Sequence, residues 1–292
     1  MMDRFALDAI AYQNDLSIDT RLEGSVRTGA LKHSLLFGVD YSRSHDFWSE
    51  QDGDAAPLDI THPVYGGPIS LTLDYVTDDT IEQTGLYAQD QVKLDRLVMT
   101  GSVRQDFAHT RTKDVLADNA IDQHARKFTG RVGAVYEFDG GLAPYASFST
   151  SFQPTIGTTF DGTPLEPTTA RQWEGGIKYQ PKGSGRSAML SVYQLEERDV
   201  TTADPNPDHP NQVVQTGGAR VRGVELSGDL ALVDGFTTTF AYTFMDSKVT
   251  AANDDTLGKQ LMDVARHSAS AWLDKVVALG NGDRLTWGLG AR

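Results

Sequence analysis

The chain has 292 residues, with 40 acidic and 26 basic side chains and a net charge of −14 at neutral pH. A nucleic-acid-binding protein needs Lys and Arg to displace counterions from phosphate, so this balance argues against that class. The absence of Cys excludes disulfides and thiolate metal sites. No apolar run approaches the about 20 residues of a transmembrane helix, and the first residues lack the basic-then-apolar pattern of a signal peptide.

Apolar and polar side chains alternate at every second position in several segments, which is the periodicity of a β-strand. In 97–106, Leu97 and Met99 oppose Ser102 and Arg104, and 129–138 repeats the pattern. Helical periodicity is nearly absent. We therefore predict about twelve strands, in chain order 15–27, 33–46, 81–94, 97–109, 126–138, 143–153, 169–180, 187–200, 214–232, 236–250, 264–278 and 284–292.

Short and long connections alternate between these predicted strands. The short connections are 95–96, 139–142, 181–185 and 234–235, and the long polar ones are 47–80, 110–125, 154–168, 201–213 and 251–263. A soluble β-sandwich has turns of mixed length at both ends, whereas an outer-membrane barrel has short turns on one side and long loops on the other. We therefore predict an all-β fold that forms an antiparallel transmembrane β-barrel wall.

The bilayer gives each face of such a wall a different surrounding. Backbone groups must be paired within the wall, and about 9–11 residues of each strand cross the membrane. Phe236, Phe240 and Phe244 share one face, which is expected to meet lipid, while Arg131 and Glu137 are expected to face a wet lumen.

Two details of these faces concern aromatic residues. An interfacial aromatic girdle is expected around one short connection, formed by Tyr136, Phe138 and Tyr145. In 264–278, Ser268, Ser270 and Trp272 share a face, and the sequence leaves the direction of that face open.

Several strings in the chain are recognisable in their order. Residues 29–41 hold Gly-Ala-Leu-Lys-His and Leu-Phe-Gly-Val-Asp-Tyr, and residues 85–91 read Gly-Leu-Tyr-Ala-Gln-Asp-Gln. Further strings are Arg-Gln-Asp at 104–106, Tyr-Ala-Ser-Phe-Ser-Thr-Ser-Phe-Gln-Pro at 145–154, Gln-Trp-Glu-Gly-Gly-Ile-Lys-Tyr at 172–179, Arg-Gly-Val-Glu-Leu at 222–226 and Tyr-Thr-Phe-Met-Asp at 242–246. Together they resemble the barrel strands of TonB-dependent siderophore receptors, closest to the ferrichrome, or ferric-hydroxamate, group.

The resemblance implies a barrel of about 22 strands around an N-terminal plug domain. Nothing in the sequence resembles the plug, so 1–292 is expected to be an incomplete barrel domain of about twelve strands, without the plug and the C-terminal strands. The implied location is the outer membrane of a Gram-negative bacterium. The implied function is uptake of a ferric siderophore of the hydroxamate type, energised by the TonB–ExbB–ExbD system through the plug. The siderophore is transported ligand, and no cofactor is expected.

Aromatic residues at the long connections are the candidates for contact with the chelate, because a hydroxamate complex of low net charge suits apolar contacts and few ion pairs. The candidates are Phe47, Trp48, His62 and Tyr65 on the first long connection, and Phe128 and Phe160 near the outer ends of later strands. Each of them could instead belong to loop packing or to the aromatic girdle. The residues in the matched strings that we expect to support the wall and lumen are Tyr87, Gln89, Arg104, Glu174 and Glu225.

Metal and catalytic sites are not expected. The clusters 52–54 and 253–255 offer oxygen ligands, but neither extends into a calcium-binding loop, and the seven His residues lack metal-ligand spacing. No catalytic motif is present, so we predict that the protein is not an enzyme. The acidic connections could bind divalent cations that bridge lipopolysaccharide, and solvation explains them equally well.

Two other classes remain open from the residues alone. One is an independent 12-stranded outer-membrane barrel, acting as a passive channel or a lipid-modifying enzyme. The other is a soluble secreted β-protein or surface lectin. A stable open pore in planar bilayers would favour the first, and recovery without detergent would favour the second.

Overall fold

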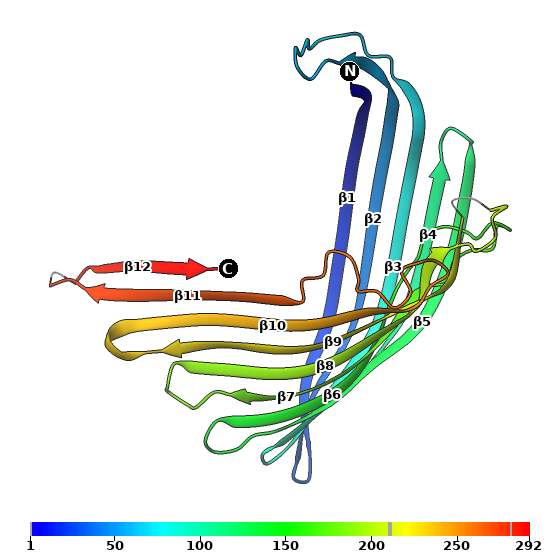
Figure 1. Cartoon of the computed structure of the whole chain (residues 1–292). Coiled ribbons are helices and arrows are strands. Elements are labelled where there is room, and N and C mark those ends of the chain that lie inside the picture. The colour runs from blue at the N-terminus through cyan, green and yellow to red at the C-terminus, as the bar shows by residue number, and fades with distance from the viewer. Residues whose placement is uncertain (1, 210–211, 281) are drawn as a thin grey trace. The chain divides into compact units, whose positions relative to one another are not determined.

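The computed structural model describes residues 2–209, 212–280 and 282–292, and these residues form one antiparallel sheet of twelve strands in chain order (Figure 1). The strands are β1 (Met2–Thr28), β2 (Leu31–Leu58), β3 (Thr72–Leu94), β4 (Leu97–Asp114), β5 (Asn119–Tyr136), β6 (Leu142–Gln153), β7 (Thr168–Tyr179), β8 (Arg186–Ala203), β9 (Val213–Ala231), β10 (Phe236–Ala251), β11 (His267–Ala278) and β12 (Arg284–Ala291). Between β9 and β10 lies a 3-10 turn, η1 (Val233–Gly235). No helix within the described ranges is long and apolar enough to cross a membrane. The predicted all-β antiparallel fold is confirmed.

The chain divides into two compact units. Unit 1 comprises Met1–Thr20, Gly38–Leu86 and Gln105–Lys127, and unit 2 comprises Arg21–Phe37, Tyr87–Arg104 and Phe128–Arg292. Strands β6 to β12 therefore lie entirely in unit 2, and each unit is described by itself below.

In unit 2 the short connections lie at one end of the strands and the long ones at the other (Figure 1). The short connections are 137–141, 180–185, 232–235 and 279–283, and the long ones are 154–167, 204–212 and 252–266. Gly141 shows why the short end is glycine-rich: its φ is +82°, and a Cβ on it would lie 2.5 Å from Pro181 in the next turn.

Cross-strand partners separate the two faces of the unit 2 sheet. Leu226 of β9 pairs with Leu190 of β8 and with Tyr242 of β10, whereas its neighbour Glu225 pairs with Ser191 and Thr243. Paired residues share a face and successive residues alternate. The apolar face includes Phe148, Trp173, Ile177, Leu190, Val192, Val224, Leu226, Phe236, Phe240, Phe244 and Leu273, and the polar face includes Ser147, Glu174, Ser191, Tyr193, Glu225, Asp229, Thr239 and Asp274.

Burial is reversed relative to a water-soluble protein. The buried apolar side chains among the described residues are few and include Val76, Ala108, Leu165 and Ala219, while the buried polar ones are Thr77, Asp106, Thr110, Gln123, Ser191, Thr202 and Ser247. Trp173 is 61% exposed and Val192 is 52% exposed. No second sheet covers the apolar face in the described ranges. An uncovered apolar surface of this extent is typical of a face that contacts a membrane or another protein.

The register settles the direction that the sequence left open in β11. Trp272 pairs with Thr239 of β10 and with Gly290 of β12, so Ser268, Ser270 and Trp272 lie on the polar face. The indole Nε1 donates to the Asp274 carboxylate at 2.7 Å. The ring lies over Gly290, where a Cβ would come within 2.0 Å of it.

One expectation about the aromatic girdle is wrong. The hydroxyl of Tyr145 donates to the Glu174 carboxylate at 2.6 Å, which places Tyr145 on the polar face. Its phenol can find a partner there and could not on the apolar face. Tyr136 and Phe138 do lie together, with ring centroids 4.8 Å apart.

The strand boundaries predicted for unit 1 are also wrong in part. Strand β1 begins at Met2, β2 runs on to Leu58 and β3 begins at Thr72, so the long connection is 59–71 and not 47–80. The region 110–125 is a hairpin whose turn, 115–118, is held by the N–H groups of Leu116 and Ala117 donating to Asp114. These strand segments are rich in polar and acidic residues and lack a regular hydropathy alternation, although their backbones are paired as strands.

Candidate functional site

Three long connections of unit 2 meet through side-chain contacts and form what we call the loop cluster, residues 154–167, 204–209 and 252–266. Gln215 at the start of β9 accepts a hydrogen bond from the Glu166 N–H, and its amide donates to the Asp199 carbonyl at 3.0 Å. Asn253 donates through its amide to the Thr216 hydroxyl at 2.7 Å, and its N–H donates to the Thr202 hydroxyl at 3.2 Å. These contacts tie the connections to the ends of β8 and β9.

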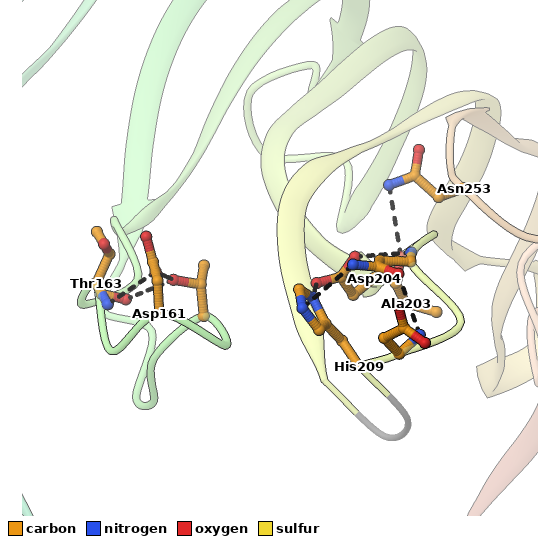
Figure 2. A network of polar contacts seen from close by, with 9 residues as sticks. Asp161, Thr163, Ala203, Asp204, His209 and Asn253 are labelled. Atoms are coloured by element: carbon orange, nitrogen blue, oxygen red, sulfur yellow. Dashed lines mark hydrogen bonds and ion pairs between the residues drawn. The ribbon is translucent and has the colours of Figure 1, made fainter.

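The connection 204–209 folds around Asp204 (Figure 2). One carboxylate oxygen of Asp204 accepts the Asn206 N–H at 2.9 Å, and the other lies 2.8 Å from His209 Nδ1. Asn206 Oδ1 accepts the N–H of Asp208 at 3.1 Å. The Asn206 N–H and then His209 hold the pKa of Asp204 below its ordinary value, because both stabilise the ionised carboxylate.

The connection 154–167 is organised in the same way by Asp161 (Figure 2). Its carboxylate accepts the Thr159 hydroxyl and, at 3.2 Å, the Thr163 N–H. These bonds, the Thr159 hydroxyl first, lower the pKa of Asp161. Leu165 is buried at 7% exposure and anchors the end of the connection.

Phe160 joins these two connections. Its ring stacks on the His209 imidazole with centroids 3.5 Å apart and an angle of 12° between the ring planes. Phe160 itself is 57% exposed, so the stack presents an aromatic surface to solvent. The contact between His209 Nδ1 and the Asp204 carboxylate fixes the imidazole in this stack. Such a surface can take an apolar or planar part of a ligand.

The structure places the six predicted contact residues in different settings. Phe47 and Trp48, expected on a connection, lie within β2, while His62 and Tyr65 lie on the exposed connection 59–71. Phe128 lies on the same face of β5 as Val132, which pairs with Phe148 on the apolar face. Phe160 is the candidate that the structure places in the loop cluster.

From the sequence, Asn253 was considered only as an oxygen ligand in the cluster 253–255 and His209 only among the seven His residues, and neither was expected to join the connections. Their partners are distant in the chain, so spacing carries no sign of the contact. The run Asp-Pro-Asn-Pro-Asp-His at 204–209 does indicate a turn in which Asp and Asn side chains bind nearby N–H groups.

The polar face of unit 2 carries a second set of functional candidates, the carboxylates of Glu174 and Glu225. Glu174 accepts hydrogen bonds from the Tyr145 hydroxyl at 2.6 Å and from the Gln172 amide at 3.0 Å. Glu225 lies on the same face, paired in register with Ser191 of β8 and Thr243 of β10. Neither carboxylate forms an ion pair with a Lys or Arg within the part of the chain that the structure describes. They can therefore receive a cationic group from outside the sheet.

Two of the residues suggested as oxygen ligands, Asp254 and Asp255, are engaged in other contacts. Asp254 accepts the Thr256 N–H at 2.9 Å, and Asp255 lies 2.7 Å from Lys259 Nζ. Within residues 2–209, 212–280 and 282–292, no group of three or more His, Asp or Glu side chains is arranged to hold a metal ion.

Comparison with known proteins gives concordant matches. The family model described as TonB dependent receptor-like, beta-barrel, matches residues 3–292. The chain is 35% identical over 278 residues to the ferrioxamine B receptor of Salmonella typhimurium (strain LT2), covering 95% of this chain and 39% of the relative. It is 31% identical over 304 residues to the ferrichrome outer membrane transporter/phage receptor of Escherichia coli (strain K12), covering 99% of this chain and 39% of the relative. The chain thus spans about two fifths of the length of these relatives.

Solved structures agree on the fold. The siderophore receptor PiuA from Acinetobacter baumannii superposes with a TM-score of 0.76 at 18% identity, covering 91% of this chain and 44% of that one. FpvA of P. aeruginosa, bound to heterologous pyoverdines, gives a TM-score of 0.76 at 20% identity, covering 97% and 38%.

Proposed function

The chain belongs to the TonB-dependent receptor β-barrel family, and on that premise we propose that it forms part of the wall of an outer-membrane receptor that takes up a ferric siderophore. The observation that carries the proposal is the uncovered apolar face of a sheet whose connections alternate in length, because this is the architecture that a bilayer demands. The sheet has β1 and β12 as its two edges. We propose that further strands close it into a barrel, since unpaired backbone groups at an edge are not tolerated in lipid.

The siderophore is proposed to be of the hydroxamate type. Support comes from the two relatives at 31–35% identity, which are named as ferrioxamine B and ferrichrome proteins. The Phe160–His209 stack supplies an exposed aromatic surface in the loop cluster where such a chelate could rest.

A binding measurement tests this proposal. Titration of a neutral ferric trihydroxamate into the chain folded in detergent should quench tryptophan fluorescence. Phe160→Ala should weaken binding about five- to tenfold, as expected for loss of one aromatic contact. Phe128→Ala is the matched control, because Phe128 lies on the apolar face and its loss should leave affinity unchanged. Absence of binding to a folded chain, or equal effects of both substitutions, would contradict the proposal.

Transport is proposed to require a plug domain and the TonB–ExbB–ExbD system in the assembled receptor. Glu174 and Glu225 support this part, because two carboxylates without cationic partners on the polar face can pair with basic groups of a domain inside the barrel. The plug, and not chemistry in the wall, would then gate the path.

The apolar face is proposed to contact outer-membrane lipid, and its outer rim to contact lipopolysaccharide. Arg220 of β9 pairs in register with Lys248 of β10 and Glu196 of β8, on the continuation of the apolar face towards the long connections. Basic side chains at this end of the strands can form ion pairs with the phosphate groups of the outer leaflet.

No enzymatic activity is proposed, since the relatives are receptors and transporters. The remaining alternative, an independent passive channel, is tested in planar bilayers. A stable open conductance from the chain alone would favour the channel, whereas the receptor proposal expects no uniform pore from a sheet with two free edges.

A further inference from the structure

We propose that a groove between β1, β2 and β3 of unit 1 binds the cationic group of a ligand, so that the receptor prefers a positively charged ferric chelate over a neutral one. This inference rests on the proposed function and adds the charge class of the substrate. The groove has a volume of about 280 Å³, and its lining includes Gln13, Asp46, Trp48, Thr77 and Asp79.

Side-chain pairing shows on which face of unit 1 the groove opens. His45 of β2 lies 2.9 Å from Asp78 of β3, so these two residues share one face. Their chain neighbours Asp46 and Asp79 therefore point to the opposite face. That opposite face is the polar one, because Gln83, four residues beyond Asp79, donates to the buried Asp106 at 2.8 Å.

The carboxylates in the groove lack a compensating charge. Asp46 accepts a hydrogen bond from Ser44 at 3.0 Å, and neither Asp46 nor Asp79 forms an ion pair within the described part of unit 1. The Oδ1 atom of Asp79 is fully buried and has no hydrogen-bond partner there. Leaving a buried carboxylate oxygen unsatisfied costs free energy. An ammonium group entering the groove would supply both the missing hydrogen bond and the missing charge.

The aromatic wall of the groove suits the same kind of group. Trp48 is 39% exposed, and its indole Nε1 donates to the Glu50 carboxylate at 3.2 Å, which fixes the ring beside a third acidic residue. The face of an indole attracts cations. Phe47 and Tyr12 also line the groove, and their rings stack with centroids 5.0 Å apart, which links β1 to β2.

The groove lining therefore selects by charge. Apart from Ala11, its residues are acidic, polar or aromatic, and no Lys or Arg is among them. A cation gains from Asp46, Asp79 and the indole together, an uncharged group gains only from the indole, and an anion is repelled. A ferric hydroxamate that carries an ammonium group at the end of a flexible arm fits this pattern, because the arm lets the ammonium reach the groove.

The test compares two chelates that differ only in this charge. One is a linear ferric trihydroxamate with a free terminal ammonium group, and the other is the same chelate with the amine acetylated. The chain folded in detergent should bind the ammonium form about five- to tenfold more tightly. The double variant Asp46→Asn/Asp79→Asn should reduce this preference to less than about twofold while binding the acetylated form as before.

Asp52→Asn is the matched control, since Asp52 is an exposed residue of β2 that does not line the groove. It should keep the preference. Should the double variant fail to fold, the ionic-strength dependence of the unmodified chain replaces it: the preference should fall as salt screens the charges, without affecting the acetylated chelate.

The outcomes separate the two proposals. Equal affinity of the unmodified chain for the two chelates, or a preference that survives in the double variant or in high salt, overturns the charge assignment and leaves the proposed function standing. Failure of both chelates to bind a folded chain overturns the proposed function as well.

Discussion

The strand wall of unit 2 and its loop cluster are built by the same chain, yet different forces determine their structures. In the wall, each position is assigned by the surrounding that its face meets, so Leu226 and Ser227 have opposite chemistry although they are neighbours. In the loop cluster, each position is assigned by a specific hydrogen bond, such as those that Asp204 and Asp161 accept from nearby N–H groups.

This difference has a consequence for substitution. In the wall, substitutions that keep the polarity of a position should change the free energy of unfolding little, and substitutions that change it should lower the free energy of unfolding. The loop cluster should tolerate changes of polarity at exposed positions and resist the loss of single carboxylates. The following predictions test this contrast, beginning with the largest expected effect.

Leu226→Arg should destabilise the wall by about 2–4 kcal/mol, because it places a charge on the face that we propose contacts lipid. Leu226 lies on the apolar face between Leu190 and Tyr242. The measurement is the free energy of unfolding by urea of the chain folded into lipid vesicles.

Ser227→Arg is the adjacent control and should cost less than about 1 kcal/mol, since it adds a cation to the polar face between Glu225 and Asp229. Similar losses from the two substitutions would mean that the two faces of β9 do not meet different surroundings.

Gly223→Ala should destabilise the wall by about 1–3 kcal/mol through overpacking. The added Cβ would lie 2.4 Å from the Tyr193 ring, which crosses this glycine. Gly175→Ala is the comparison, because a Cβ there meets its nearest neighbour, the Tyr145 carbonyl oxygen, at 3.7 Å. The same urea titration applies, and a loss at Gly175 as large as that at Gly223 would contradict the packing argument.

Acidification should loosen the connection 204–209 with a small effect on the wall. Because the pKa of Asp204 is lowered in the folded loop, the unfolded loop takes up the proton first as pH falls. Its contribution is thus complete above the ordinary Asp pKa of about 3.9 and is lost as pH falls below it.

Amide hydrogen exchange at Asn206 and His209 measures this loss, after correction for the intrinsic pH dependence of exchange. Asp204→Asn should raise exchange at neutral pH and remove the change in protection below pH about 4. Unchanged protection in that variant would show that another contact holds the connection.

The contrast also explains what the sequence could predict. Strands β6 to β12 were predicted within a few residues, for example 143–153 for Leu142–Gln153, since apolar and polar residues alternate along them. The parts of β2 and β3 next to the connection 59–71 were missed because polar and acidic residues interrupt the alternation there. Phe47 and Trp48 were accordingly expected in a connection, although they are strand residues.

The candidate site was only partly accessible to the same reasoning. Phe160 could be proposed as an exposed aromatic residue near a strand end, whereas its stack on His209 depends on how two connections fold. The buried oxygen of Asp79 depends on the packing of three strands, and alternation contains no information about it.

The rings that cross glycines in unit 2 have a consequence for how the strands find their alignment. Short turns fix the offset between the strands they join, but a long connection leaves that offset free to slip. Tyr145 crosses Gly176 between β6 and β7, and Tyr193 crosses Gly223 between β8 and β9; both strand pairs are joined by long connections. If either strand pair slipped by two residues, the ring would meet a side chain in place of the glycine. These two contacts therefore fix the register of strand pairs whose long connections do not fix it.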